Sequence, residues 1–323
     1  MMNETFDLLL PRIIDCNNKV DYEKMISSLR QIKDTCICIG TGGSNIVSAY
    51  AKDVISESND VLTMNMEPRT FLYTNVSKCN SACLFSYGGY NYGVDEVLRK
   101  TLQEKMNSIV FTSDNGHLEK LNPNVIINYQ GAIDKEVSFI SIASTFMPMS
   151  LLLRYYLHDK RILFEELMSE LYIESNHYIN QLELDLCNND IDIMTGDNTY
   201  VASSALESTL VEAGLARPLM HEKYSYCHGR TTLPFYHKPA LLIYFINGRA
   251  REIDNLLLDN IKSLYNQVVV IKSNYEDKLI GSFDLTLKAM LLAKKIALEL
   301  GKDLSKVDYA PQVKKLYRFK GEM

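Results

Sequence analysis

Several features are missing from this chain of 323 residues, and each absence narrows what the protein can be. No apolar run reaches the roughly 18 residues that a membrane-spanning helix needs. The first residues include Asn3, Glu4 and Asp7 and lack the basic region and apolar core of a secretory signal. A basic excess is also missing, because the formal net charge is −6. We therefore expect a cytoplasmic protein that binds neither membranes nor nucleic acid.

The cysteines form neither a disulfide framework nor a metal-binding pattern. There are seven, an odd number at irregular spacing, which fits a reduced compartment. Cys36 and Cys38 alternate within a strand-like run, and Cys79 and Cys83 are four positions apart. No histidine at ligand spacing accompanies them. We predict that these four are small buried apolar side chains and that the protein holds no metal.

The phosphate-binding fingerprints of nucleotide enzymes are incomplete. Gly40-Thr41-Gly42 resembles the first half of a dinucleotide fingerprint, but Asn45 stands where the third glycine belongs. The Walker pattern is absent, since no Gly-Lys-Ser or Gly-Lys-Thr occurs. We expect no organic cofactor, and a nicotinamide-dependent dehydrogenase built on the Gly40 turn is a weak alternative.

The pattern that is present indicates an α/β protein. Apolar residues make up 46% of the chain, enough for buried cores, and the length suggests two domains. A helical pattern at 5–33 precedes a short apolar strand at 35–39, a glycine-rich turn and a helix through Val54. That order is the first unit of a parallel sheet. In the same half, further strands are predicted at 82–85, 108–111 and 124–127, and helices at 94–102 and 144–157.

The second half repeats this order after a helical stretch at 159–187, in which Leu163, Leu167, Leu171 and Ile179 have helical spacing. We therefore predict two similar doubly wound parallel-sheet domains of flavodoxin-like α/β type. The predicted strands are 190–194, 240–245 and 267–271, and the helices 205–212 and 283–300. The predicted division is an N-terminal helical segment 1–33, a first domain 34–156, a helical connection 157–189, and a second domain with a basic C-terminal tail 190–323.

Three turns of the first half are rich in glycine and hydroxyl groups, at 41–45, 86–91 and 141–145. Ligands of parallel α/β sheets bind beyond the carboxyl ends of the strands, where such turns lie. Glycines let backbone N–H groups approach a ligand, and helix N-termini favour a phosphate or polyol. The candidate binding residues are Gly42, Gly43, Ser44, Ser86, Gly88, Gly89, Asn91, Ser144 and Thr145.

A carboxylate and a histidine in the second half are candidates for proton transfer. Glu212 ends a predicted helix before Gly214, and His228 follows sixteen positions later. A partly buried Glu212 would have a raised pKa and could take a proton next to a carbonyl group. The alternatives are an exposed helix-end glutamate and a capping histidine.

Three neighbouring groups compete for these roles. Glu207 could line a pocket or pair with a cation. His221 and His237 could join Glu222 in a metal cluster, but their distances of seven and nine positions from His228 are not helical ligand spacing.

Taken together, these motifs resemble the sugar isomerase (SIS) domain proteins, in the two-domain form found in the isomerase half of glucosamine-6-phosphate synthase and in related isomerases and deglycases. The resemblance extends from about residue 34 to the end. It rests on the turn at 40–44, the turn at 86–91, and Ile142-Ala143-Ser144-Thr145, where Phe146 replaces the family's lysine. The most specific match is the sixteen-residue spacing of Glu212 and His228-Gly229.

The resemblance implies an aldose-ketose isomerase or sugar-amine deglycase acting on a sugar or sugar phosphate through an enediol or enediolamine. Glu212 would be the base and His228 the ring-opening residue. Because this histidine can come from the neighbouring subunit in the family, the resemblance also implies a homodimer.

Besides Phe146, the sequence departs from the family at four further positions. Gly88 and Asn91 replace two hydroxyl residues of the phosphate loop, and Thr209 stands where the synthase has a lysine. Arg230 replaces the proline after histidine-glycine and could supply the missing anion contact. These departures motivate an alternative, a non-catalytic sensor of the same fold that binds a sugar phosphate.

Overall fold

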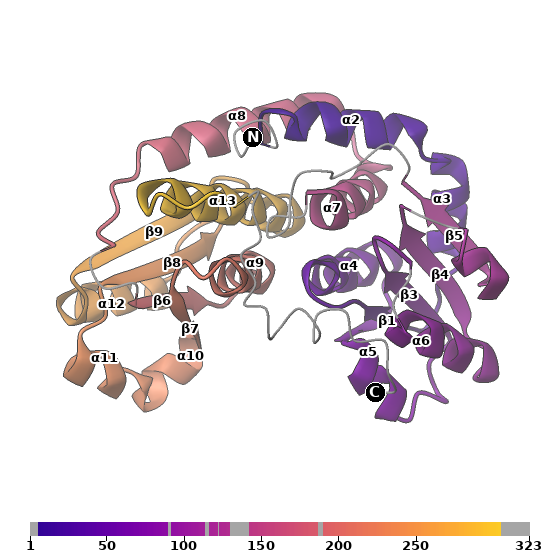
Figure 1. Cartoon of the computed structure of the whole chain (residues 1–323), viewed down its shortest axis with the longest axis horizontal. Helices are drawn as coiled ribbons and strands as arrows, with labels where there is room; N and C mark the ends of the chain where they lie inside the picture. The colour runs from indigo at the N-terminus through magenta and orange to yellow at the C-terminus, as the bar shows by residue number, and fades with distance from the viewer. Residues whose placement is uncertain are drawn as a thin grey trace. The chain divides into compact units, whose positions relative to one another are not determined.

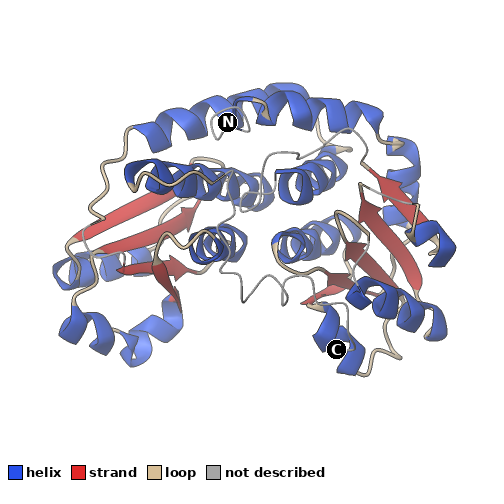
Figure 2. Ribbon diagram, viewed as in Figure 1, coloured by secondary structure: helices blue, strands red, loops and turns tan. Residues whose placement is uncertain are grey.

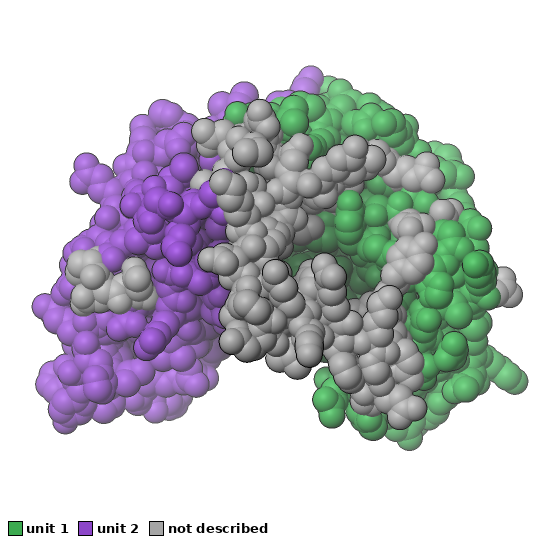
Figure 3. Space-filling view, in the orientation of Figure 1, with its two compact units in different colours: residues 1–165, 306–323 green, residues 166–305 purple. Residues whose placement is uncertain are grey.

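The computed structural model describes residues 6–89, 92–113, 116–121, 123–129, 142–186 and 190–304. They form two compact units that divide between Glu165 and Glu166 (Figure 3). Each unit contains one parallel sheet with helices on both faces (Figures 1 and 2). The predicted fold class, two doubly wound α/β units, is confirmed. Asn91 and the basic C-terminal tail lie outside the described residues.

The first unit is built on a five-stranded sheet in the order β2-β1-β3-β4-β5, in which all neighbouring strands are parallel. The strands are β1 (Thr35–Ile39), β2 (Leu62–Met66), β3 (Ser81–Phe85), β4 (Asn107–Thr112) and β5 (Val125–Asn128). The helices are α2 (Leu9–Lys19), α3 (Tyr22–Arg30), α4 (Gly43–Asn59), α5 (Pro68–Tyr73), α6 (Tyr92–Gln103), the 3-10 turn η1 (Leu118–Leu121) and α7 (Ile142–Leu157).

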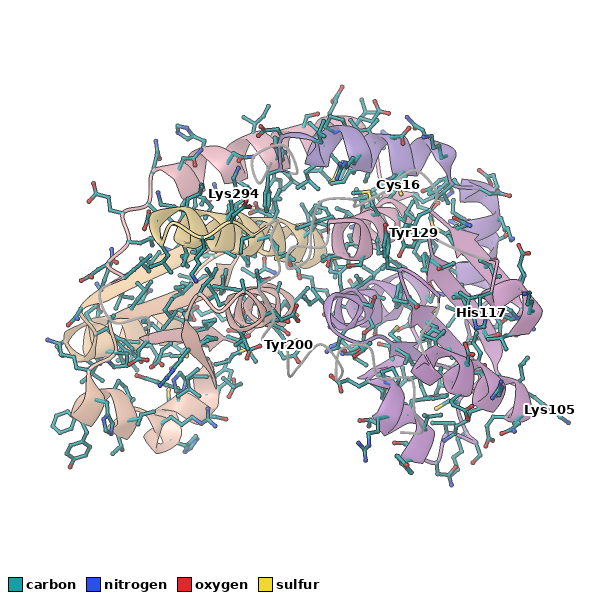
Figure 4. The ribbon with its side chains drawn as sticks, in the orientation of Figure 1. Cys16, Lys105, His117, Tyr129, Tyr200 and Lys294 are labelled. Atoms are coloured by element: carbon teal, nitrogen blue, oxygen red, sulfur yellow. The ribbon has the colours of Figure 1, made fainter. Side chains whose placement is uncertain are left out.

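Side chains on one face of this sheet pack against α5, α6 and η1. Ile37, Leu84 and Val110 of three adjacent strands join Phe71 and Val97 in one buried cluster. Helices α4 and α7 pack against each other, and α2 packs against α7. On α2, Cys16 is fully buried (Figure 4), and burial raises the pKa of its thiol to about 12. Such a thiol stays protonated and unreactive.

The cysteine prediction holds for three of its four residues. Cys36, Cys38 and Cys83 lie in β1 and β3 and are fully buried. Cys79 is only half-buried. In the described ranges, no helix is long and apolar enough to cross a membrane.

The second unit has a four-stranded parallel sheet in the order β7-β6-β8-β9. Its strands are β6 (Asp190–Thr195), β7 (Arg217–Glu222), β8 (Leu241–Asn247) and β9 (Gln267–Ser273). The helices are α8 (Phe164–Asn180), which begins at the unit boundary, α9 (Tyr200–Glu212), α10 (Lys223–Ser225), the turn η2 (Tyr226–Arg230), α11 (Thr232–His237), α12 (Glu252–Ile261), η3 (Lys262–Leu264) and α13 (Lys278–Glu299).

The sequence prediction missed one edge strand in each sheet. β2 is half-exposed along most of its length, so it lacks a continuous apolar run. β7 contains Pro218, which a strand tolerates at a sheet edge because one N–H side faces away from the sheet. Two other details were wrong. α13 begins five residues before the predicted 283, with Asp277 capping the N–H groups of Leu279 and Ile280, and Leu163 precedes α8 and is exposed.

Candidate functional site

In the first unit, two polar turns start side by side at the carboxyl edge of the sheet. β1 pairs with both β2 and β3. The chain passes from β1 to β2 on one side and then crosses to β3 on the other side of β1. Ile39 is the register partner of Leu84, which places the turns after β1 and β3 next to each other. This is the topological switch point at which doubly wound sheets bind ligands.

The first turn needs glycine at two positions. A Cβ on Gly40 would lie 2.1 Å from the carbonyl oxygen of Ser44, which no side chain can tolerate. Gly42 has a φ of 55° and immediately precedes α4. A Cβ on Gly43 would lie 3.1 Å from both Ser144 Oγ and Thr145 Oγ1. The structure therefore brings the first turn and the start of α7 together, although they are far apart in the sequence.

The resulting polar cradle consists of Gly42, Gly43, Ser44, Ser144 and Thr145. The three hydroxyl residues are at most 9% exposed. In the described part of the chain, the N–H groups of Gly42 and Gly43 donate to no protein acceptor. They lie at the N-terminus of the 17-residue helix α4, whose dipole favours negative charge there. The cradle has the donors that a phosphate or carboxylate requires.

The second turn is anchored to the end of β4. The N–H of Ser86 donates to the carbonyl of Phe111 (3.0 Å), and the N–H of Ser113 donates to the carbonyl of Tyr87 (3.1 Å). Gly89 has a φ of 63°. A Cβ built on Gly88 would meet no atom of the described residues within 4 Å. Ser86, Gly88 and Gly89 thus lie beside the switch point, whereas the predicted partner Asn91 lies outside the described residues.

Glu212 is the last residue of α9 in the second unit. The helix, which begins at Tyr200 (Figure 4), buries Ala205 and Leu210, whereas Glu212 lies on its exposed side. Ser208 Oγ donates a hydrogen bond of 2.9 Å to Glu212 Oε1. Partial desolvation and the nearby charge of Glu207 raise the pKa of Glu212, and the Ser208 hydrogen bond opposes the rise. A carboxyl group with this property suits proton transfer.

His228 lies on the exposed turn η2 that follows β7. Its backbone leaves helical geometry at φ −92° and ψ 30°, and Gly229 continues at φ 112°, where glycine is favoured. Glu212 precedes the start of β7, and His228 follows its end. The strand between them spans about 17 Å, at roughly 3.3 Å per residue. Within one chain the two residues therefore flank opposite ends of β7.

Comparison with known proteins identifies the fold. No protein-family model and no curated protein matches the chain. Tagatose-6-phosphate ketose/aldose isomerase from Escherichia coli matches with a TM-score of 0.77 and 12% identity, covering 96% of both chains. Glucosamine-6-phosphate deaminase from Thermotoga maritima matches with 0.72 and 16%, covering 94% of this chain and 98% of that one. The C-terminal domain of glucosamine-fructose-6-phosphate aminotransferase from Francisella tularensis matches with 0.69 and 13%, covering 94% and 95%.

This chain has the tandem sugar isomerase fold. The resemblance predicted from the sequence motifs is confirmed as a likeness of fold over nearly the whole chain. At 12–16% identity the likeness shows the fold alone.

The structure shows the contacts of two residues, Thr209 and Arg230, at which the sequence departs from the family pattern. Thr209 is 3% exposed and donates its hydroxyl to Met290 Sδ at 3.4 Å. It is therefore part of the packing of α9 on α13. Arg230 Nη1 donates to the carbonyl of Met220 at 3.3 Å, and the side chain lines a pocket beside β7. Its assignment as a phosphate contact stays a prediction.

A buried charged cluster in the second unit was missed by the sequence analysis. Lys223 is 2% exposed and pairs with Asp197 and with Asp254, the latter at 2.9 Å. The hydroxyl of Tyr244 donates to Asp254 at 2.5 Å, and the Arg251 N–H donates to it at 2.7 Å. Lys223 and Asp197 follow the carboxyl ends of β7 and β6. Charged residues just after parallel strands are the sequence pattern from which the cluster could have been predicted. Arg251 Nη1 also pairs with Asp197 Oδ1 at 2.9 Å, so two cations compensate two carboxylates, and the cluster joins β6, β7 and α12.

The metal alternative has no geometric support. Among the described residues, no group of three or more His, Cys, Asp or Glu side chains could hold a metal ion. The carboxylate of Glu222 instead accepts the N–H groups of Tyr224 and Ser225. His221 is buried, at 1% exposure, while His237 is exposed.

Proposed function

We propose that this protein interconverts aldose and ketose forms of a sugar phosphate, or removes an amine from a sugar-amine adduct, by proton transfer through an enediol or enediolamine. The observation that carries the proposal is the polar cradle at the switch point of the first sheet, where Gly43 meets the hydroxyls of Ser144 and Thr145. Two structures with the same fold are described as a tagatose-6-phosphate ketose/aldose isomerase and a glucosamine-6-phosphate deaminase.

In this proposal the first unit binds the substrate. The N–H groups of Gly42 and Gly43 and the hydroxyls of Ser44, Ser144 and Thr145 hold the phosphate. Ser86, Gly88 and Gly89 form the neighbouring wall, and Asn91 belongs to the same predicted turn. The anion is neutralised by N–H donors and the α4 dipole, and Arg230 is a further predicted contact.

The second unit supplies the proton transfer. Glu212 takes a proton from the carbon next to the carbonyl group and, after the enediol has formed, returns it to the former carbonyl carbon, a task that its raised pKa favours. His228 moves the proton that opens the sugar ring. Because β7 separates Glu212 from His228, the proposal assigns this histidine to a second copy of the chain, as a homodimer would provide. A carboxylate suffices for the shuttle, so the reaction requires no cofactor or metal.

Replacing Glu212 tests the proposal. We expect Glu212→Gln to lower kcat by roughly a hundredfold to ten-thousandfold, because general-base catalysis contributes that much. The Kd for the sugar phosphate should change little. The assay measures product from a panel that includes tagatose 6-phosphate and glucosamine 6-phosphate. Glu207→Gln, on the same helix, is the matched control and should retain activity. Full activity in Glu212→Gln would contradict the assignment.

A second candidate, a sensor that binds a sugar phosphate without converting it, is favoured by two observations. Gly88 offers no hydroxyl and opens to free space. Thr209 stands in place of a family lysine, and its hydroxyl is buried against Met290. One experiment distinguishes the sensor from the isomerase. The wild-type protein is mixed with each sugar phosphate, and NMR follows both binding and product formation. Saturable binding without product would support the sensor and overturn the isomerase.

A further inference from the structure

The second unit contains a pocket of about 520 Å³ between the edge strand β7 and the segment that follows it. This volume lies within the range of small-molecule sites, roughly 300–1,000 Å³. The pocket lies beside His228, because its wall includes the next two residues of the chain. Its lining consists of Leu219, His221, Gly229, Arg230, Thr232, Leu233, Tyr236 and His237.

One wall of the pocket holds a buried histidine whose polar atoms are unsatisfied. His221 is 1% exposed, and neither ring nitrogen makes a hydrogen bond within the described residues. Its Nε2 lies 3.2 Å from Asp192 Oδ2 without hydrogen-bond geometry, and Tyr265 already donates to that oxygen at 2.8 Å. A buried polar group without a partner costs about 1–3 kcal/mol.

The remaining walls combine apolar surface with positive charge. Leu219, Leu233 and Tyr236 are 40%, 44% and 74% exposed, an unusual concentration of exposed apolar surface. Arg230 donates only one long hydrogen bond, to the Met220 carbonyl at 3.3 Å, which leaves most of its guanidinium N–H groups available. His237 adds a second group that can carry positive charge.

Among the residues that the structure describes, no acidic side chain lines the pocket. Three carboxylates lie on β6 and β7, and none of them belongs to the lining. Asp190 is exposed at the start of β6. Glu222 accepts the N–H groups of Tyr224 and Ser225, and Asp192 is buried and accepts the hydroxyl of Tyr265. The lining therefore has an apolar floor, one guanidinium and two imidazoles, with no opposing negative charge.

We propose that this pocket binds a small aromatic carboxylate. The ring packs on Leu219, Leu233 and Tyr236, and the carboxylate accepts a bidentate pair of hydrogen bonds from Arg230. A single charge matches the single arginine in an apolar wall better than a phosphate dianion does. The phosphate cradle lies in the first unit. Arg230, named above as a further predicted phosphate contact, binds the aromatic carboxylate in this proposal instead.

The experiment is an NMR titration of the full-length protein with labelled leucine methyl groups, using benzoate as the probe. We expect saturable shifts of the Leu219 and Leu233 methyl signals. Benzamide has the same ring without the charge, and acetate has the charge without the ring. Each should bind at least fivefold more weakly than benzoate. Equal affinity for benzoate and benzamide, or no methyl shifts with millimolar benzoate, would overturn the proposal.

Two arginine variants separate the pocket from general surface charge. Arg230→Gln should weaken benzoate binding about tenfold, as expected for the loss of a charge-assisted hydrogen-bonded pair. Arg217→Gln, at the other end of β7 and outside the pocket lining, should leave the affinity unchanged. Equal weakening by both variants would contradict the site. Methyl signals that change on dilution but not with benzoate would show that a second copy of the chain covers the pocket, and would also overturn the proposal.

Discussion

Gly43 is the more closely packed glycine of the proposed phosphate cradle in the first unit. Its backbone approaches the hydroxyls of Ser144 and Thr145 so closely that a methyl group there would press on both. Because Gly43 has no side chain, the backbone N–H groups of the first turn and the hydroxyls at the start of α7 can lie close together. A Cβ on Gly88, by contrast, would meet no atom within 4 Å in the part of the chain that the structure describes.

This contrast gives a matched pair of variants. Gly43→Ala should weaken sugar phosphate binding by tenfold or more, because its Cβ would lie 3.1 Å from two hydroxyl oxygens of the cradle. Gly88→Ala adds a methyl group that meets no atom of the described residues within 4 Å, so it should weaken binding less than Gly43→Ala does. Calorimetric titration measures both affinities. A larger loss in Gly88→Ala than in Gly43→Ala would refute the assignment of the cradle.

The environment of Glu212 predicts a definite pH dependence. Its pKa is raised mainly by desolvation and is lowered by the hydrogen bond from Ser208. The active base is the deprotonated form, so kcat/KM should rise with pH through this raised pKa. Ser208→Ala removes the opposing hydrogen bond and should move the rise to higher pH. Carboxyl-carbon NMR titration of Glu212 checks the direction without an activity assay. A shift to lower pH in Ser208→Ala would contradict this account.

At the scale of elements, the sequence predicted the central strands and missed an edge strand in each sheet. β1, β3 and β8 are short, mostly apolar and buried, so hydrophobicity identified them. β6 carries Asp190 and Asp192 between its apolar residues. The edge strand β7 has an alternating, mostly exposed pattern and a proline, which resembles a loop. It exists because β6 offers a parallel partner, and a single-sequence pattern does not contain that information.

For the candidate site, the sequence predicted the polar turns but not the tertiary contacts that they make. The three polar turns were located from their composition and from the strands before them. The contact between Gly43 and α7, the burial of Thr209 and the pairing of Lys223 depend on tertiary packing. The sequence therefore identified candidate residues but not their neighbours.

The buried charge cluster gives a test at this scale. Lys223→Met would leave Asp254 and Asp197 without their buried cation, which should destabilise the protein by about 3–5 kcal/mol. Lys262→Met changes an exposed lysine of η3 and should alter stability by less than about 0.5 kcal/mol. Urea denaturation measures both. Equal stability of the two variants would show that the cluster does not hold β6, β7 and α12 together.

At the scale of the whole molecule, the position of β7 between Glu212 and His228 leads to a test of assembly. If each site takes His228 from a second copy, Glu212→Gln and His228→Asn should each be inactive alone. When the two are unfolded and refolded together, mixed dimers contain one intact site. We expect about a quarter of wild-type activity after random pairing in equal amounts. Mixtures that stay inactive would show that both residues act within one chain.

The central claim is that this fold moves a proton between adjacent sugar carbons through Glu212. The most direct measurement is deuterium incorporation from heavy water into each hexose 6-phosphate, followed by NMR. The account predicts exchange at the carbon next to the carbonyl group with wild-type protein and with Glu207→Gln, and none above background with Glu212→Gln. Wild-type protein that binds a sugar phosphate without exchanging its proton, or equal exchange by Glu212→Gln, would contradict it.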